Sequence, residues 1–485
     1  MTQPASITRF AADDSGPMLV MWGVSFVVLF GIVALSFDLG RIGITRSELQ
    51  AYADNIVLAA AGELDGNADA LTRAQAAAEN LIADRKTFGN GDDALSGAAD
   101  FTLTFYSDIP ASDTAPLTAV TTDPAEARYV HADVMDSTVA ATFGAVFAAL
   151  SGNAGPNENA SATAVAGFTQ YACDITPLMF CIPSGWTADA NVGTMIRLRA
   201  GGNGAAWGPG DFGFLDPSKV EVDDEGPCAG LNGGNLDSCL MGAEGIITQC
   251  FSQRGVDTEP GQKVGITDAA FNVRFDIYKA TMNGERNDPD YAPAPNVIKG
   301  IVPNGGGSCI GNNENPSPDS VGLPRDSCFD LGTCSRFGDG DWSAGRTDYV
   351  TANYGGIDPH PLAVTRYAYY LAEIAAAGGA GSSNPILSGL AESGRPQCSP
   401  HQSSDPKRRV LVAAGIDCTA NPVSGSTNDV PVREFVEIFL TEPVGDDGTS
   451  PPRLDIWGEV IGTAGGGAGG TGDAGIFRDV VQLYR

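Results

Sequence analysis

The chain has 485 residues and a formal net charge of −31, with 43% hydrophobic and 18% charged residues. At about 100–200 residues per domain, this length indicates two or three domains, and the apolar content is sufficient for a folded core. The negative charge repels phosphate groups, so it argues against nucleic acid as a partner and against adhesion to anionic lipid headgroups.

An uncharged apolar segment lies near the N-terminus, from Met18 to Phe37. As a helix it would span about 30 Å, the thickness of a hydrocarbon core, and it lacks the polar face of a soluble core helix. We therefore expect a transmembrane helix that contacts the lipid bilayer, preceded by a cytoplasmic tail at residues 1–16. A cleavable signal is the alternative. The run is longer than the usual signal core of about 7–15 residues, and Asp13 and Asp14 precede it.

The same helical pattern continues beyond the apolar segment. Apolar side chains recur at spacings of three or four as far as Leu64, which is one face of a helix. We expect residues 17–64 to form a transmembrane helix extended as a stalk. Outside the membrane this face must be covered, either by the protein's own domain or by a partner helix. The residues of the predicted helix-packing face are Leu49, Ala53, Ile56 and Ala60.

Cysteines indicate the orientation, which charge leaves open because Arg9 precedes the helix while Arg41 and Arg46 follow it. An even number of widely spaced cysteines indicates disulfides in an oxidising compartment, with buried free thiols as the alternative. We expect a cytoplasmic N-terminus and a periplasmic C-terminal domain. Spacing does not fix the pairing, but it favours two local pairs, Cys173–Cys181 and Cys328–Cys334. The ten disulfide candidates are Cys173, Cys181, Cys228, Cys239, Cys250, Cys309, Cys328, Cys334, Cys398 and Cys418.

The remaining sequence predicts an α+β fold in two further parts. Residues 65–170 indicate a small α+β domain, with a helix over Leu71–Ile82 and an alternating strand at Phe101–Phe105. Residues 171–485 indicate a large Cys-rich, disulfide-rich domain of mostly β and loop structure. Its expected strands are Arg409–Ala414, Phe435–Leu440 and Leu454–Val460, with Val480–Tyr484 closing the sheet.

Little in the sequence supports catalysis. The three histidines, His131, His360 and His401, lie in no nucleophile or metal motif. We therefore predict that the protein is not an enzyme and has no catalytic, cofactor-binding or metal residues. The segment Asp339–Asp341, with Asp330 nearby, resembles half of a calcium loop, but the closing glutamate is missing. A solvated turn is favoured there, and a weak calcium site near Asp339 stays open.

The order of short motifs around the apolar segment is characteristic. Asp14 and Gly16 precede it, Asp38-Leu39-Gly40-Arg41 follows it, and Leu49-Gln50-Ala51-x-Ala53-Asp54 and Ala59-Ala60-Ala61 come next. This order resembles the N-terminal module of TadG-like Flp (Tad) pilus-assembly proteins. The segments Arg128–Ala132, Phe143–Leu150 and Ser161–Gly167 are similar to a strand, a short helix and a second strand of that family.

The resemblance implies a single-pass inner-membrane protein of a pilus-assembly system that supports adhesion and biofilm formation. Its partners would be other Tad pilus-assembly membrane proteins. Two residues depart from the pattern of prepilin-type processing, because Pro17 follows Gly16 and Met21 stands where a glutamate is required. We therefore expect an unprocessed chain that acts as a structural component. The alternative function is a surface-exposed adhesin or pilus-tip binding protein, and an undetected envelope enzyme is a third hypothesis.

Overall fold

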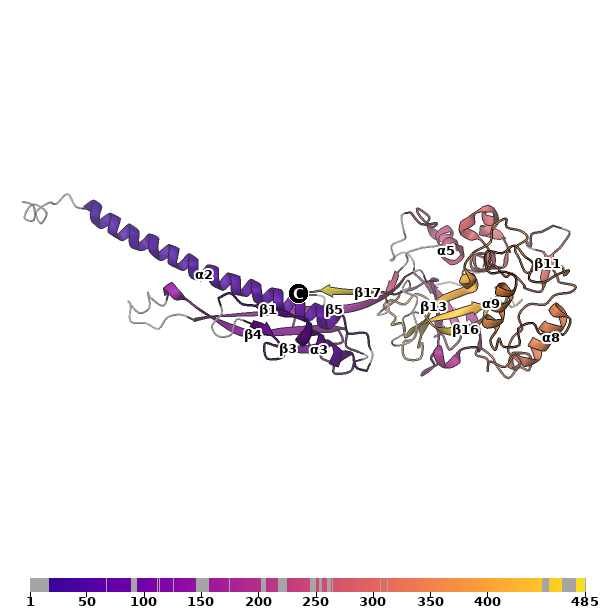
Figure 1. The fold of residues 1–485 in the computed structure, drawn as a ribbon, viewed down its shortest axis with the longest axis horizontal. Helices are drawn as coiled ribbons and strands as arrows, with labels where there is room; N and C mark the ends of the chain where they lie inside the picture. The colour runs from indigo at the N-terminus through magenta and orange to yellow at the C-terminus, as the bar shows by residue number, and fades with distance from the viewer. Residues whose placement is uncertain are drawn as a thin grey trace, which may run out of the picture. The chain divides into compact units, whose positions relative to one another are not determined.

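The computed structural model forms two compact units (Figure 1). Unit 1 comprises residues up to Thr169 together with Asp479–Arg485, and unit 2 comprises Gln170–Arg478. The structure describes residues 17–484 except 67, 89–93, 111, 113, 125, 145–156, 174, 202–205, 217–224, 245–249, 253–254, 260–262, 264, 306, 312, 447–452 and 465–476. The expected tail at 1–16 and most of the stretch Phe143–Leu150 lie outside the described residues.

Unit 1 is built on one long helix, α2, which covers Pro17–Ala61. Proline suits the first helical position, because its missing N–H group has no intrahelical partner there. The second helix, α3, begins at Ala70 and ends at Leu81, which confirms the helix expected over Leu71–Ile82. The strands that lie wholly or mostly in this unit are β1 (Ala83–Arg85), β2 (Ala94–Ser96), β3 (Phe101–Tyr106), β4 (Tyr129–Ala140), β5 (Asn157–Cys173) and β17 (Phe477–Leu483).

The main sheet of unit 1 has the order β17-β5-β4-β3, and its β3–β4 and β4–β5 pairs are antiparallel. The alternating segment Phe101–Phe105 is strand β3, as expected. Helix α2 packs along β4, and α3 packs beside α2 (Figure 1). The shared core is rich in alanine on the strand side, with Ala132, Ala160, Ala162, Ala164 and Ala166 all buried. Small strand residues let a helix approach a sheet closely.

Unit 2 contains a closed β-barrel. The strand pairs run β8–β6–β13–β14–β16–β7 and return from β7 to β8, which closes the ring. In addition, β10 pairs with the end of β8 and β15 pairs with the start of β16. Closure satisfies backbone groups that an open edge would expose. The strands are β6 (Leu178–Cys181), β7 (Met195–Ala200), β8 (Asp211–Leu215), β10 (Thr258–Glu259), β13 (Val410–Ile416), β14 (Glu434–Leu440), β15 (Gly445–Asp446) and β16 (Leu454–Thr463). Strands β13, β14 and β16 confirm the three strands expected there.

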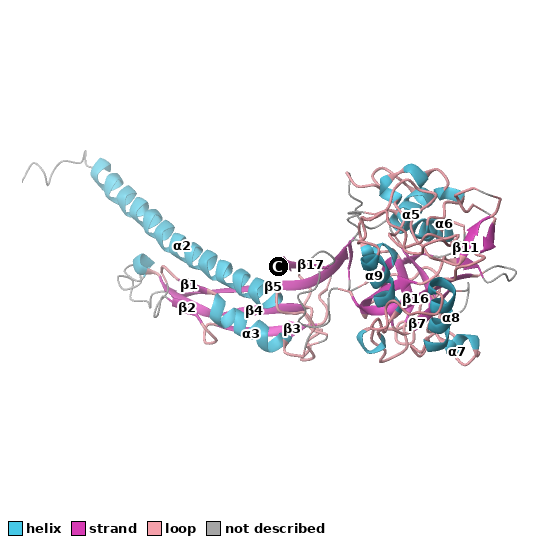
Figure 2. Cartoon of the chain, turned by 45° about the vertical axis from the view of Figure 1, so that its right-hand side comes forward, coloured by secondary structure: helices cyan, strands magenta, loops and turns pink. Residues whose placement is uncertain are grey.

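Helices and short strands surround the barrel of unit 2. Helix α9 contacts strand β16 (Figure 2). Tyr370 of α9 and Phe439 of β14 belong to one buried aromatic cluster. The described helices are α5 (Gly233–Gly242), α6 (Thr267–Asn272), α7 (Ser327–Asp330), α8 (Ser343–Tyr354) and α9 (Arg366–Ala376). Short 3-10 turns are η1 (Asp189–Asn191), η3 (Val273–Phe275), η4 (Ala280–Met282), η5 (Glu285–Asn287), η6 (Pro289–Tyr291) and η7 (Pro406–Arg409). The remaining strands are β9 (Cys250–Ser252), β11 (Ile301–Pro303) and β12 (Glu314–Pro316).

The C-terminal strand corrects one prediction. We expected Val480–Tyr484 to close the sheet of the Cys-rich domain, and this prediction is wrong. Strand β17 pairs with β5 instead, and residues from Asp479 onward belong to unit 1. The backbone N–H of Tyr484 donates to the carbonyl of Val165 over 2.8 Å. An apolar strand pattern shows that a strand pairs, but not with which partner.

Five disulfides join the ten cysteines of unit 2: Cys173–Cys250, Cys181–Cys418, Cys228–Cys239, Cys309–Cys398 and Cys328–Cys334. The local pair Cys328–Cys334 is confirmed. The local pair Cys173–Cys181 is wrong, because each cysteine has a partner on a neighbouring segment. Cys173 lies opposite Cys250 in the β5–β9 pair. Cys181 is the last residue of β6, which runs parallel to β13, and β13 ends just before Cys418. Sheet register decides this pairing, not sequence distance.

Candidate functional site: the N-terminal anchor and its border

The first part of α2 exposes apolar side chains on all sides. Between Met18 and Phe37 the exposed fractions of the large hydrophobic side chains run from 48% at Phe26 to 74% at Leu19. Trp22, Phe26 and Phe30 form a ladder of rings along one side, with centroids 5.7 and 6.2 Å apart. Among the described residues, this helix is long and apolar enough to cross a membrane. A helix that is apolar all round is stable when lipid surrounds it.

Asp38 marks the border of this apolar part. Its side chain is only 7% exposed, and its carboxylate accepts the backbone N–H groups of Phe143 and Gly144 at 3.3 and 2.7 Å. These N–H groups open a short helical turn at residues 142–144. Free N–H groups at the start of a helical turn favour a carboxylate. The aspartate that ends the apolar run therefore fastens α2 to its own unit.

Arg41 adds a second attachment one turn further on. Its guanidinium donates to the hydroxyl of Thr142 and lies over the ring of Phe88, 5.2 Å from the centroid. Glu48 accepts the backbone N–H of Thr87 at 2.8 Å. The charged residues that follow the apolar segment thus attach α2 to the rest of unit 1.

The predicted helix-packing face lies inside unit 1. Leu49, Ala53, Ile56 and Ala60 are all fully buried in the core that α2 shares with the sheet. The sequence left open whether the protein's own domain or a partner helix covers this face. In the structure, the protein's own domain covers it. Tyr52 is buried on the same face, with its ring 6.4 Å from that of Phe101. Tyr52 lies three residues after Leu49 and four before Ile56. This helical spacing is the sequence signal that puts it on the packing face.

The opposite side of α2 carries small residues just beyond the apolar part. Ser36, Gly40, Gly43, Ser47 and Ala51 follow one another at spacings of three or four, and all are exposed. A Cβ atom added at Gly40 or Gly43 would meet no atom within 4 Å. Glycine inside a helix costs about 1 kcal/mol relative to alanine, so this face sacrifices local helix stability.

The carboxylates of the possible calcium site near Asp339 accept backbone hydrogen bonds within a turn. Asp339 accepts the backbone N–H of Asp341 at 3.1 Å, and Asp341 accepts that of Ser343, at the start of α8, at 3.0 Å. Hydrogen bonds from Ser343 lower the pKa of Asp341 below its usual value of 3.8. These bonds favour the turn that we expected.

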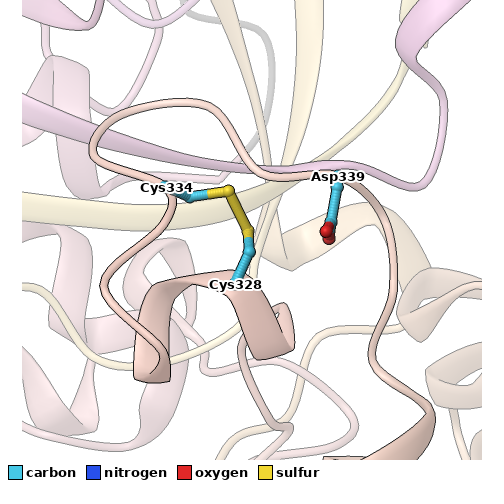
Figure 3. A group of neighbouring side chains, drawn as sticks. All are labelled: Cys328, Cys334 and Asp339. Atoms are coloured by element: carbon cyan, nitrogen blue, oxygen red, sulfur yellow. A yellow bond between two sulfur atoms is a disulfide. The ribbon is translucent and has the colours of Figure 1, made fainter.

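A carboxylate oxygen of Asp339 also lies within 4.8 Å of the sulfur atoms of Cys328 and Cys334 (Figure 3). The two sulfur atoms are bonded to each other. A metal binds the thiolate form of cysteine, so in the disulfide state this group is a poor metal site.

Each histidine makes a local packing or hydrogen-bond contact. The ring of His131 in β4 lies edge-on to Tyr106, and that of His360 lies edge-on to Tyr369 with centroids 5.1 Å apart. The Nε2 atom of His401 is 3.0 Å from the carbonyl oxygen of Asn287. Burial lowers the pKa of His360, although Asp358 nearby opposes the shift. These contacts give each ring a structural role.

Together these features define a class of protein: one apolar helix able to span a membrane, an α+β unit built on the same helix, and a disulfide-linked β-barrel unit. Residues 16–63 match the family model described as Putative Flp pilus-assembly TadE/G-like, which confirms the resemblance inferred from the motifs of this segment. The match covers the anchor, the Asp38 border and the packing face. No curated protein and no solved structure matches the chain.

Proposed function

We propose that the protein is a single-pass inner-membrane component of Tad/Flp pilus assembly, and that it serves adhesion and biofilm formation by building pili. Its N-terminus lies in the cytoplasm and its barrel unit in the periplasm. The observation that carries the proposal is the family match over residues 16–63, which coincides with the apolar helix and its buried continuation. The five disulfides support an oxidising compartment for unit 2.

The role is structural and not enzymatic in this proposal. Support comes from the chemistry of the residues that catalysis would use first. The histidines make local structural contacts, and Asp339 and Asp341 accept hydrogen bonds within a turn. Its partners are other pilus-assembly proteins of the same membrane. They would meet α2 on the small-residue side, since the opposite side is occupied by the sheet of unit 1.

Deletion of the gene tests this proposal. We expect the deletion strain to make no surface pili, counted by electron microscopy, while pilin still accumulates in the cell. The wild-type gene should restore the pili. A variant in which a cleavable secretion signal replaces residues 1–37 should release folded protein into the periplasm and should not restore pili. Varying the anchor is the cleaner design, because substitutions at Ile56 or Ala60 would disturb the core of unit 1.

The outcome also separates the two candidate functions. Normal pilus numbers in the deletion strain would contradict the assembly role. If, in addition, the protein were found in sheared pili and adhesion were lost, the adhesin or tip-protein alternative would be correct. Protease added to spheroplasts checks the orientation, since it should digest unit 2 only where that unit faces the periplasm.

A further inference from the structure

A hollow lies against α2 where the apolar segment ends. Its volume is about 480 Å³, and it is lined by residues of α2 between Ile32 and Ile44 and by Phe88, which follows strand β1. The side chains that line it are almost all apolar, and Arg41 is the charged residue among them. A volume of this size lies in the range of about 300–1,000 Å³ that is typical of small-molecule sites. Gly40 leaves room in the hollow, since a Cβ atom there would meet no atom within 4 Å.

The hollow spans the border between the hydrocarbon core and the headgroups. With Met18–Phe37 inside the core, Ile32 and Phe37 lie in its outermost part, and Arg41 lies about 6 Å beyond Phe37 along the helix. Ile32 and Phe37 are 59% and 61% exposed in the chain by itself. An empty space beside them would lose dispersion contacts on one side, so acyl chains or another protein must fill it.

Arg41 puts a positive charge at the headgroup end of the hollow. Its guanidinium lies over the ring of Phe88, 5.2 Å from the centroid, and donates to the hydroxyl of Thr142. A guanidinium has five N–H donors in a planar fork that suits phosphate oxygens, so Arg41 can bind a phosphate and keep its bond to Thr142. A phospholipid has its parts in the matching order, with apolar chains followed by a phosphate.

A second hollow continues from the first one, away from the membrane. Gly40 and Ile44 line both hollows, and the second has a volume of about 600 Å³. Among the described residues, the charged side chains that line the second hollow are Glu48 and Asp84, and Asp84 is exposed. The two basic residues that follow Asp84 in the sequence line neither hollow. The lining is therefore basic at the level of Arg41 and acidic beyond it.

We propose that the two hollows bind one phospholipid with a zwitterionic ethanolamine headgroup, taken from the membrane leaflet that faces unit 1. An acyl chain lies along Ile32 and Phe37, the phosphate binds Arg41, and the ammonium group faces Asp84. An anionic headgroup offers no cation to the two carboxylates, and the net charge of −31 also disfavours it. This inference rests on the membrane anchor of the proposed function, but not on a role in pilus assembly.

A helix from a second copy is the competing occupant, because small residues such as Gly40 let helices approach closely. Charge argues against it. Two copies inserted in the same direction hold Arg41 at the same depth, so their guanidinium groups would repel each other across this contact. A bound lipid leaves the far end of the second hollow, at Ser47 and Ala51, to the protein partners proposed above.

Native mass spectrometry of the detergent-solubilised full-length chain tests the site. Dioleoyl phosphatidylethanolamine and dioleoyl phosphatidylglycerol, which have the same acyl chains, are titrated separately. We expect one molecule of phosphatidylethanolamine to bind, with an affinity at least about tenfold higher than that of phosphatidylglycerol.

Gly40→Leu fills the hollow and should weaken the binding of phosphatidylethanolamine at least about tenfold. Gly31→Leu is the matched control and should keep the affinity within about threefold. Position 31 lies nine residues before position 40, about two and a half turns, and therefore on the opposite side of α2. A Cβ atom meets no atom within 4 Å at either glycine, so neither variant should lower the thermal midpoint.

Two further variants test the headgroup contacts. Arg41→Gln should weaken the binding of phosphatidylethanolamine at least about tenfold, whereas Thr142→Val, which removes the hydroxyl acceptor but keeps the guanidinium, should not change it. Asp84→Asn should reduce the preference for phosphatidylethanolamine over phosphatidylglycerol at least about threefold.

Equal affinities for the two lipids, equal binding by the wild type and Gly40→Leu, or a dimer that Gly40→Leu disrupts would overturn the proposal. Extraction of membranes with alkaline carbonate tests the anchor separately. A chain released by carbonate would refute the anchor, and with it both this inference and the proposed function. Loss of lipid selectivity in a chain that stays in the membrane would refute the lipid site alone.

Discussion

At the scale of single residues, the barrel unit depends on ionisable groups that are buried and hydrogen-bonded. Arg366 is fully buried and bridges Asp326 and Glu459, at 2.5 and 3.1 Å. Glu373 is 1% exposed and accepts hydrogen bonds from Tyr349, Tyr354 and Asn296 at 2.6, 2.7 and 2.7 Å. Removing one partner leaves the other buried groups of the network unpaired. The loss of stability is then larger than the net contribution of the intact network.

Glu373 leads to a prediction about pH. Burial raises its pKa above the usual value of 4.5, against the opposing effect of its hydrogen bonds from Tyr349, Tyr354 and Asn296. The folded state therefore keeps a proton that the unfolded state has released, and stability from this group is lost as the pH rises above 4.5. Glu373→Gln does not titrate. We expect the thermal midpoint of the wild type to fall relative to that of the variant as the pH rises above 4.5. A difference that is constant with pH would refute this account.

At the scale of secondary-structure elements, the alanine-rich strand β5 explains a motif that the sequence only hinted at. The segment Ser161–Gly167 lies in β5, which pairs with β4 on one side and with β17 on the other. Gly167 has the rings of Tyr129 and Tyr484 against it, and these rings lie edge-on with centroids 5.3 Å apart. The glycine leaves the space in which the C-terminal residues pack.

Gly167 gives a second prediction. A Cβ atom at this position would lie 2.6 Å from Cδ1 of Tyr129 and 2.9 Å from Cε2 of Tyr484, so both rings must move. We expect Gly167→Val to lower the free energy of unfolding by about 1–3 kcal/mol. Gly445→Ala is the control, because its Cβ would meet no atom within 4 Å. Urea unfolding of both variants in detergent measures the effect, and equal stabilities would show that the contact with Tyr484 does not matter.

At the scale of the whole molecule, the two units have different means of stabilisation. Unit 1 packs a long helix on a sheet of small residues, while unit 2 closes a barrel and adds five disulfides. The pair Cys181–Cys418 joins positions 237 residues apart, whereas Cys328–Cys334 spans only 6. A disulfide that closes a longer loop removes more entropy from the unfolded chain.

The disulfides give a third prediction at this scale. Replacing both Cys181 and Cys418 by alanine should lower the free energy of unfolding by about 5 kcal/mol, and replacing both Cys328 and Cys334 by about 2 kcal/mol. Both double variants are compared with the wild type by chemical unfolding under non-reducing conditions. If the short pair proved the more important, local packing and not loop closure would be the dominant effect of these bonds.

Much of the local structure could be predicted from the sequence. Periodicity identified the long helix, its buried face at Leu49, Ala53, Ile56 and Ala60, and the strands β3, β13, β14 and β16, because each pattern depends on which side of an element is apolar. The motif order around Asp38 predicted the family model that residues 16–63 match. The partner of each element was harder to infer. Strand β17 and the disulfide of Cys173 were misassigned for this reason.

The sequence by itself therefore determined the apolar anchor and most of the elements, since length and polarity act locally. Only the tertiary structure decided that the stalk face is covered by the chain's own sheet, that six strands close into a barrel, and that Ile357, Leu362 and Val364 in the loop between α8 and α9 point outward. An aliphatic residue in a sequence is expected inside. Here Arg346 of α8 and Trp342, just before that helix, hold the loop backbone with its aliphatic side chains in solvent, and no local pattern records such long-range hydrogen bonds.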